Sequence, residues 1–425
     1  FIYFYMKVGI IGSGGREHSI CFNLNNSKKI SKIFCFPGNA GTSDIAENVN
    51  LDLDNFDQLK RFINKKKIDL IIIGPEKPLV DGLVDFLEKN KIKVFGPNKI
   101  CSKLEGSKIF TKRLCEKFNI PTAKFGIFQN KTKAKEFLKK TKYPTVIKAD
   151  NLASGKGVYI CNNFKEAFVA VDEIFNGKFG DAKNILVEEF LAGEEMSFFI
   201  VSDGNTFKTF GTAQDHKRVL EGDKGKNTGG MGCYSPSRLI TNELEKKIIK
   251  KIIKPTLKGL NEINEKFIGF LYAGLMIVEN EPYLIEYNVR MGDPECQTIL
   301  PKLKTELVDI INACCEKKLK EIKIEWHDKK SLCVVLCSKG YPEKFEKHVE
   351  IKNVNFIQNT KNDFLFHAGT EKKNEKIYAI GGRVLNYVCL SEDFKTAKEN
   401  IINRITKLNW VNGFYRKDIG YKVIK

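Results

Sequence analysis

Short apolar runs, each closed by a glycine- or proline-rich turn, recur along the first part of the chain. Helical stretches separate these runs, which are Lys7–Ile11, Lys32–Phe36, Asp69–Ile73 and Lys93–Phe95. Strands that alternate with helices predict a doubly wound, parallel α/β sheet. Ligands bind such sheets beyond the carboxyl ends of the strands, so the turns that follow these runs mark a candidate binding edge.

Beyond residue 106 the pattern favours strands that pair with their neighbours along the chain, as in an α+β fold. The predicted strands are Pro144–Ala149, Val158–Cys161, Ile185–Leu191, Ser197–Val201, Thr206–Gly211, Phe270–Val278, Pro282–Val289, Leu332–Cys337 and Ile377–Leu385. The predicted helices are Ser107–Phe118, Lys165–Phe175, Glu243–Ile263 and Asp393–Ile405. No internal repeat and no low-complexity linker interrupts this order.

Composition places the chain among ordinary globular proteins. It has 425 residues, 42% of them hydrophobic and 29% charged, and no apolar run is long enough for a membrane span. The apolar residues 1–5 lack the basic flank and cleavage site of a signal peptide, so we expect the folded domain to begin at Met6. The five residues before it are interpreted as an upstream translation artefact.

Cysteine spacing argues against a metal or disulfide framework. The twelve cysteines contain no CxxC pair, and no histidine or cysteine stands at the complementary spacing of a zinc site. Free, mostly buried thiols in a reducing cytoplasm are the favoured interpretation.

The net charge of +19 permits an anionic partner such as nucleic acid or a phosphorylated substrate. The lysines are dispersed, however, and no clustered basic patch or aromatic platform is visible. Compositional drift is therefore favoured, together with a phosphate-rich small ligand, and no specific nucleic acid is expected.

A glycine-rich turn, Gly12 to His18, follows the first strand and opens a helix. A dinucleotide fingerprint would need glycine at position 17, where the chain has Glu17, so the spacing is weak evidence for a nicotinamide cofactor. Backbone N–H groups at a helix N-terminus could still hold an anion. A plain strand-to-helix turn explains the same residues equally well.

The stretch "KADNLASGKGV", residues 148–158, places two lysines around a run of small residues. Glycines allow the backbone to approach phosphate oxygens, and Lys148 and Lys156 could supply charge. The spacing is not that of a Walker A loop, and a basic hairpin tip is the simpler alternative.

In the strand that ends "EYNVR", period-two alternation puts Glu286, Asn288 and Arg290 on one face and Ile285, Tyr287 and Val289 on the other. A carboxylate and an amide oxygen suit Mg²⁺, which completes its shell with water and phosphate. The alternative is a half-exposed polar strand face. The acidic stretch from Met291 to Glu295 favours a functional rim.

A further polar and glycine-rich region runs from Gln214 to Arg218 and from Asn227 to Gly232. Its length favours a mobile substrate loop over a plain connection. His216 alone is weak evidence for chemistry, and a hydrogen-bonding structural histidine is the commoner case.

Taken together, these motifs resemble the phosphoribosylamine–glycine ligase family, also called glycinamide ribonucleotide synthetases, of the ATP-grasp superfamily. The resemblance runs from Met6 to near the C-terminus and rests on "GSGGREH", "PGNAGT", "GPEKPLVDG", "LEGSK", "KADNLASGKGV", "EEFLAGEE", "QDHKR", "NTGGMG", "LYAGLM", "IEYNVRMGDPE", "FHAGT", "GGRVL" and "RKDIG", in the order of the family. The chain departs from the usual family residues at Asn151, Ser154, Met291 and Cys296, and none of these changes removes a charged group.

The resemblance implies a fold and a reaction. The fold is an N-terminal doubly wound parallel sheet (6–106), an ATP-grasp domain (107–329) with a mobile lid (121–192), and a small C-terminal α+β domain (330–425). The reaction joins glycine to 5-phosphoribosylamine with ATP and Mg²⁺ or Mn²⁺, through a glycyl phosphate, in purine synthesis. A cytoplasmic monomer is expected.

The resemblance also implies roles for individual residues. ATP phosphates would meet Lys148 and Lys108, under a lid that contains Ser154, Gly155, Lys156 and Gly157. Adenine and its ribose would lie beside Glu188, Glu189 and Leu191. The metal would bind Glu286 and Asn288, with Arg290 on the transferring phosphoryl group or the glycine carboxylate.

The remaining implied roles concern the two other substrates. Asp215, Lys217 and Asp293 would orient glycine and the amine. The phosphoribosyl group would meet Gly14, Gly15, Arg16, Asn39, Ala40, Gly41, Gly74, Pro75 and Glu76, with Glu76 on ribose hydroxyls.

Three alternatives remain at this point. Another ATP-grasp carboxylate–amine ligase would share the lid and metal strand, but "GGREH" and "FHAGT" argue against it. A nicotinamide-dependent oxidoreductase lacks its third glycine, and a nucleic-acid-binding protein lacks a clustered patch.

Overall fold

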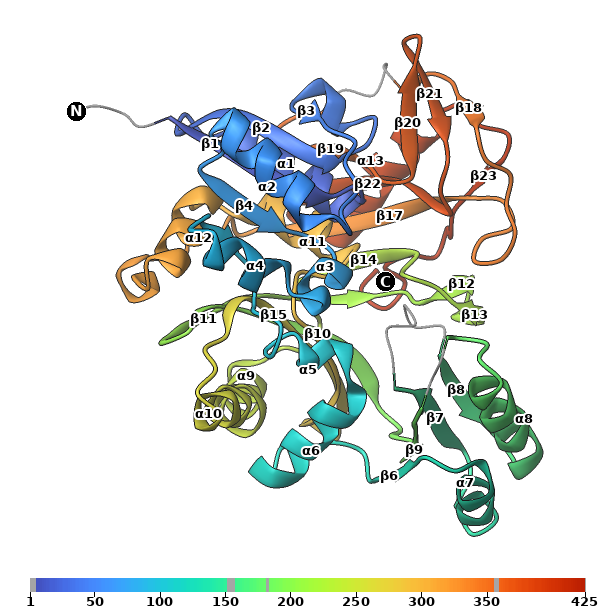
Figure 1. The fold of residues 1–425 in the computed structure, drawn as a ribbon. Helices are drawn as coiled ribbons and strands as arrows, with labels where there is room; N and C mark the ends of the chain where they lie inside the picture. Colours follow the sequence, from blue (N-terminus) through green and yellow to red (C-terminus); the bar gives the residue numbers. More distant parts are fainter. Residues whose placement is uncertain (1–4, 151–156, 181–182, 355–358, 425) are drawn as a thin grey trace.

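The computed structural model describes residues 5–150, 157–180, 183–354 and 359–424. Figure 1 shows an N-terminal sheet (blue) beside the C-terminal strands (orange to red) of a long central sheet, whose strands from the middle of the chain (green to yellow) lie below them. A smaller α/β subdomain that carries α7 and α8 projects from the other end of the central sheet. Among the described residues, no helix is both long and apolar enough to cross a membrane.

The N-terminal sheet is parallel throughout, with the order β3-β2-β1-β4-β5, and this confirms the doubly wound prediction. Its strands are β1 (Met6–Gly12), β2 (Ile30–Pro37), β3 (Glu47–Asn48), β4 (Leu70–Ile73) and β5 (Val94–Phe95). Its helices are α1 (Gly15–Asn25), α2 (Phe56–Lys66), α3 (Glu76–Asp81) and α4 (Leu83–Lys89). The strand order reverses between β1 and β4, so the turns after these two strands flank the crevice where such sheets bind ligands.

The projecting subdomain is an antiparallel sheet with the order β6-β9-β7-β8. Its strands are β6 (Phe125–Phe128), β7 (Thr145–Ala149), β8 (Val158–Cys161) and β9 (Ile185–Glu189), and its helices are α7 (Lys131–Leu138) and α8 (Phe164–Phe175). The predicted hairpin is present, since Lys148 pairs with Val158. Its apolar core is built from residues of this subdomain alone.

The central sheet continues from the middle of the chain into its C-terminal part. Its order is β16-β15-β10-β11-β14-β17-β22-β19, with β23 beside β17. The strands are β10 (Glu194–Asp203), β11 (Phe207–Asp215), β14 (Gly232–Ser235), β15 (Ile268–Val278), β16 (Glu281–Asn288), β17 (Lys330–Ser338), β19 (Asp363–His367), β22 (Arg383–Ser391) and β23 (Gly413–Phe414). Because β14 pairs with β17, one sheet crosses the predicted border at residue 329.

The other elements connect and cover these sheets. The helices are α5 (Lys103–Gly106), α6 (Lys108–Phe118), α9 (Asn242–Ile248), α10 (Lys254–Glu262), α11 (Glu295–Ile299), α12 (Leu307–Cys315) and α13 (Phe394–Ile405). One small sheet consists of β12 (Arg218–Leu220) and β13 (Lys224–Asn227). A second small sheet has the order β18-β21-β20, and its strands are β18 (Val349–Ile351), β21 (Lys376–Ala379) and β20 (Thr370–Lys373). All twelve cysteines are free and eleven are buried, as predicted.

Three sequence predictions need correction. The prediction of a single strand over Ile377–Leu385 is wrong, because the structure has two strands there: β21 ends at Ala379 and β22 begins at Arg383. Between them the backbones of Gly369 and Gly381 pack too closely to admit a Cβ atom. The helix Glu243–Ile263 holds a π-helical turn, Ile249–Ile253, between α9 and α10. The sequence also did not predict the strands β3, β6, β12, β13, β14, β18, β19, β20 and β23.

Strict alternation also fails at one place in β16. Leu275 pairs with Leu284 while Gly274 pairs with Glu286, so Ile285 is the extra residue of a β-bulge. Tyr287 and Val289 are buried and Glu286 and Asn288 are half-buried, so the alternation holds after the bulge. The bulge therefore leaves the predicted polar face in place.

Candidate active site

A cavity of about 350 Å³ lies at the carboxyl edge of the N-terminal sheet. It is lined by Gly12, Ser13, Gly14, Arg16, Glu17, Pro37, Leu53, Asp54, Pro75, Lys77, Pro78, Asp81 and Asp293. The turns after β1 and β4 thus share one cavity, and Asp293 reaches it from the central part of the chain. Gly15, Gly74, Glu76 and residues 39–41 are not among its lining residues.

The Asn39 loop supports its own fold. The Asn39 side-chain oxygen accepts bonds from the N–H groups of Gly41 and Thr42, and its amide donates to the Ser13 and His367 carbonyls at 2.8 Å. Asn39 and Ala40 are buried. These contacts tie the turn after β1 to the C-terminal strand β19.

Glu17 explains the glycines around the first turn. Its carboxylate accepts the Gly14 N–H at 2.7 Å and pairs with Arg16 Nε at 2.5 Å. A Cβ atom on Gly74 would lie 2.0 Å from Glu17 Oε1, and one on Gly12 would lie 2.5 Å from Glu17 Cγ. The residue that breaks the dinucleotide fingerprint therefore occupies the space that the glycines leave.

Arg290, at the end of β16, lies between two carboxylates. Its Nη2 is 2.7 Å from Glu105 Oε1 and 3.4 Å from Glu76 Oε2. Burial raises the pKa of Glu105 above its ordinary value. Burial also raises the pKa of Glu76, but Arg290 and Arg16 outweigh it and the net pKa is lowered. Arg290 Nε is buried without a hydrogen-bond partner among the described residues, so one donor stays available.

Lys148 on β7 lies in a buried charged cluster. Glu188 on β9 pairs with Lys148 Nζ at 2.8 Å and with Lys112 Nζ at 3.1 Å, and all three side chains are at least 94% buried. Burial raises the pKa of Glu188, but the two lysines outweigh that effect and lower it. Burial lowers the pKa of Lys108, one turn before Lys112 on α6.

Two residues at the end of β9 are more open. Glu189 is exposed and accepts the Lys124 N–H at 2.8 Å, and Leu191 is half-buried. Of the predicted lid residues, Ser154, Gly155 and Lys156 lie outside the described residues. Gly157 is described, and its carbonyl accepts the Ala149 N–H at 2.9 Å.

A second charged cluster surrounds the end of β11. Lys217 Nζ is 2.6 Å from Glu195 Oε2. Burial lowers the pKa of Lys217, but Glu195 and Asp215 outweigh it and raise the pKa well above its ordinary value. Burial raises the pKa of Asp215 to about 8, with Glu295 acting in the same direction and Lys217 opposing it.

Asp293 joins the three parts of the chain. It accepts the Arg16 N–H at 3.3 Å and the Gln297 side-chain amide at 2.7 Å, and Arg383 Nη1 lies 3.4 Å from it. Burial raises the pKa of Asp293, but Arg383 and Arg16 outweigh that effect and lower it. The N-terminal cavity and the central strands therefore meet at one ionised carboxylate.

Glu286 and Asn288 lie on β16, and both are half-buried. Glu286 acts electrostatically on both Lys108 and Lys217, since it raises the pKa of each. Among the described residues no group of three or more His, Cys, Asp or Glu side chains could hold a metal. A carboxylate beside an amide oxygen nevertheless fits Mg²⁺ or Mn²⁺, which keep waters and take oxygens from bound phosphates.

Sequence reasoning did not single out several charged residues of these clusters. They are Glu105, Lys112, Glu195 and Arg383. Lys112 carried a usable signal, because it stands four residues after Lys108 and so shares its helix face. Arg383 lies far along the chain from Asp293, and no local pattern could have paired them.

Comparison with known proteins gives matches over nearly the whole chain. The family models that match are the N domain of phosphoribosylglycinamide synthetase over residues 6–105, its ATP-grasp (A) domain over 106–296 and its C domain over 331–422. The border at 329/330 was drawn from sequence, and these ranges do not test it.

Similar curated proteins carry one name. The phosphoribosylamine–glycine ligase of Brucella melitensis is 44% identical over 421 residues, which is 99% of both chains. The protein of that name from Caldanaerobacter subterraneus is 45% identical over 97% of this chain and 99% of its own. The chloroplastic protein of Arabidopsis thaliana is 43% identical over 96% of this chain and 79% of its own.

Solved structures agree with these matches. The phosphoribosylamine–glycine ligase of Thermotoga maritima has a TM-score of 0.86 and 33% identity, and the match covers 98% of this chain and 100% of that one. An N5-carboxyaminoimidazole ribonucleotide synthetase, at 17% identity and a TM-score of 0.67 over 94% of this chain and 96% of its own, shares the fold. The chain therefore belongs to the phosphoribosylglycinamide synthetase family.

Proposed function

We propose that this protein ligates glycine to 5-phosphoribosylamine with ATP, giving glycinamide ribonucleotide, ADP and phosphate in the synthesis of purines. The full-length likeness to proteins named for this reaction supports the proposal. The observation that carries it is Asp293, which joins the N-terminal cavity to the charged strands of the central sheet. A ligase of two small substrates needs such a junction.

The chemistry is phosphoryl transfer followed by acyl transfer. An oxygen of the glycine carboxylate attacks the γ-phosphorus of ATP, and ADP leaves. The amine nitrogen of phosphoribosylamine then attacks the acyl carbon, phosphate leaves, and the nitrogen gives up a proton. The protein mainly positions the groups and neutralises charge.

Lys148 and Lys108 are assigned to the ATP phosphates. Glu188 holds Lys148 through a buried ion pair, so the ammonium group is fixed before nucleotide binds. Such preorganisation avoids the cost of ordering a flexible lysine during the reaction. Glu189 and Leu191, at the end of the same strand, are assigned to the nucleoside.

Arg290, Asp215, Lys217 and Asp293 are assigned to glycine and the reacting amine. The buried Arg290 Nε is a free donor within the described residues and suits a carboxylate or phosphoryl oxygen. Asp215 is suited to an ammonium or amine nitrogen. The phosphoribosyl group is assigned to the cavity beside Gly14, Arg16 and Pro75.

Glu286 and Asn288 would hold the divalent ion, Mg²⁺ or Mn²⁺. When bound, such an ion neutralises charge on the phosphates of the nucleotide. The half-buried position of both side chains on one strand face supports this assignment. A cytoplasmic monomer is part of the proposal, and sedimentation of the purified protein tests the oligomeric state.

The test is ADP release with glycine, measured with and without phosphoribosylamine generated in the assay. We expect release that depends on both substrates and a product that carries one glycine. The same rate with an unrelated amine would favour another ATP-grasp carboxylate–amine ligase. If no ADP is released even when glycine and phosphoribosylamine are both present, the proposal is overturned.

A further inference from the structure

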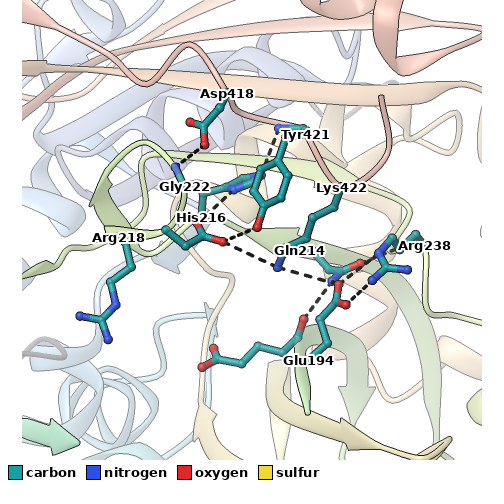
Figure 2. A network of polar contacts seen from close by, with 12 residues as sticks. Glu194, Gln214, His216, Arg218, Gly222, Arg238, Asp418, Tyr421 and Lys422 are labelled. Atoms are coloured by element: carbon teal, nitrogen blue, oxygen red, sulfur yellow. Dashed lines mark hydrogen bonds and ion pairs between the residues drawn. The ribbon is translucent and has the colours of Figure 1, made fainter. Parts of the chain in front are cut away.

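Residues 415–424 lie against the β12–β13 hairpin, which directly follows Lys217 (Figure 2). We call residues 415–424 the C-terminal strap. We propose that this strap is a positioning element, which holds the hairpin and thereby fixes Asp215 and Lys217 for the reaction. The inference rests on the proposed function, because it takes those two side chains as substrate-orienting groups.

Strand alternation connects the strap to the site. Asp215 and Lys217 project to the charged cluster with Glu195, and His216 between them projects to the opposite side. There the His216 ring accepts the Gly420 N–H on Nε2 at 3.1 Å. The Nδ1 atom of His216 therefore carries the proton and faces Asp223, 3.7 Å away. His216 is thus a buried, hydrogen-bonded histidine, which is the commoner case expected from the sequence.

Arg416 is the buried centre of the strap. Its side chain is 1% exposed and forms a bidentate ion pair with Asp418, in which Nε donates to Oδ1 at 2.8 Å and Nη2 donates to Oδ2 at 2.7 Å. Its Nη1 also donates to Asp223 at 2.9 Å and to the Arg218 carbonyl at 3.0 Å. Arg416 therefore fastens the tip and the first strand of the hairpin at once.

Further bonds close the hairpin around the strap. Asp418 accepts the Gly222 N–H at 2.8 Å (Figure 2). The Tyr421 hydroxyl donates to Asp223 at 2.7 Å. At the base of the hairpin, the Lys217 carbonyl accepts both the N–H and the hydroxyl of Thr228 at 2.8 Å. A shift of the tip would thus be transmitted to the backbone of Lys217.

The strap also fits closely against the neighbouring strand. Ile419 is fully buried, and a Cβ atom on Gly232 would lie 2.6 Å from its side chain. The His216 N–H donates to the Gly232 carbonyl at 2.8 Å. The same residue of β14 therefore contacts both the strap and the chain segment that carries Asp215 and Lys217.

The experiment replaces Asp223 by Asn, which keeps the shape and removes the charge that Arg416 and Tyr421 contact. The matched control is Glu343→Gln, because Glu343 pairs with Lys226 on the same hairpin and is exposed. For Asp223→Asn we expect kcat/KM for glycine to fall about tenfold, mainly through KM, with KM for ATP unchanged. Glu343→Gln should leave all constants unchanged.

Separate measurement of kcat and of KM for glycine distinguishes a positioning role from a loss of folded protein. Loss of folded protein lowers kcat and leaves KM unchanged, so a lower kcat with a normal KM for glycine would overturn the proposal. Tyr421→Phe should shift KM for glycine in the same direction by a smaller factor. His216→Ala should raise that KM, and His216→Gln, which can still accept the Gly420 N–H, should restore part of it.

A parallel Asp215→Asn variant separates this inference from the proposed function. If Asp215→Asn leaves KM for glycine unchanged, the assignment of glycine to this cluster fails. If Asp215→Asn raises KM for glycine and Asp223→Asn does not, only the role of the strap fails. Equal losses for ATP and glycine in Asp223→Asn would also overturn it.

Discussion

Asp215 is a half-buried carboxyl whose ionisation the fold opposes. Burial raises its pKa to about 8. A carboxyl of this kind keeps its proton in the folded state at a pH where the unfolded chain has released it. Its contribution to stability therefore falls as pH rises from roughly 4, the ordinary value for aspartate, through about 8.

The first prediction follows from this loss of stability with rising pH. Asp215→Asn removes the titrating group, so its melting temperature relative to the unchanged protein should increase between about pH 5 and about pH 8. In Glu343→Gln the difference should not depend on pH, because the hydrogen bond to Lys226 lowers the pKa of that exposed carboxyl below this range. Thermal melts at several pH values test both, and a difference that shrinks as pH rises would contradict the assignment.

Glu286 gives the second prediction. Glu286→Gln keeps the shape and removes the charge proposed to hold the metal, so we expect a cost of about 3–4 kcal/mol, or about 10²–10³ in kcat. The melting temperature should be unchanged, because the side chain is half-buried and accepts no hydrogen bond among the described residues.

The control for Glu286 lies on the same strand. Glu281 at the start of β16 pairs with Lys247 and Lys251 at the surface, away from the charged clusters. Glu281→Gln should turn over normally. Near-normal turnover of Glu286→Gln at saturating Mg²⁺, or loss of its fold, would refute the metal assignment.

At the scale of elements, sequence predicts strands best where apolar runs end in glycine or proline. The strands β1, β2 and β4 follow this rule, and their turns meet at one edge as expected. The break between β21 and β22 escaped notice because apolar residues flank it on both sides. It arises from the close approach of Gly369 to Gly381, which is a tertiary contact.

The site divides in the same way. Residues within one motif, such as Glu286 and Asn288, could be grouped because period-two alternation is a local property. The partners of Lys148 and Arg416 could not, since Glu188 lies on another strand and Asp223 lies in a turn far along the chain from Arg416. Ion pairs of this kind depend on the packed fold, which single-sequence patterns do not contain.

The third prediction concerns the turns of the N-terminal sheet. Arg16→Ala and Glu76→Ala should raise KM for phosphoribosylamine and leave ATP affinity almost intact, because Arg16 lines the cavity at the strand ends and Glu76 directly follows Pro75, which also lines it. Arg16→Ala should also lower the melting temperature, since Glu17 loses its buried partner. Steady-state kinetics and nucleotide binding test this.

The control for the turns is Glu47→Ala. Glu47 lies on β3 at the edge of the same sheet and pairs with Lys32 and Lys66. It should change neither KM. A variant of Arg16 or Glu76 that loses ATP affinity first would show that the cavity serves a different ligand.

At the scale of the whole molecule, the hydrophobic cores do not follow the predicted domain borders. One core joins residues of β1 and β2 to β14, β17 and β22. The 121–192 subdomain, in contrast, has a core built only from its own residues. The N-terminal, central and C-terminal parts should therefore unfold together, and the subdomain should unfold separately.

Two matched core substitutions test this division. Leu138 in the subdomain and Leu332 on β17 are both fully buried, and Leu332 pairs with Tyr234 across the border between β14 and β17. Leu→Ala at either position should cost about 2–5 kcal/mol, because each change leaves a cavity in a packed core. The two changes should act on different unfolding transitions.

Calorimetry provides the measurement. Leu138→Ala should lower only the transition of the 121–192 subdomain, and Leu332→Ala should lower only the larger one. A chain cut after Lys329 should not fold, since β14 would lose β17 at every paired position from Gly232 to Ser235. One transition lowered by both substitutions, or a stable fragment that ends at Lys329, would contradict this. The continuous sheet also holds the C-terminal strap close to the hairpin, because β17 of the C-terminal part pairs with β14, the strand that follows the hairpin.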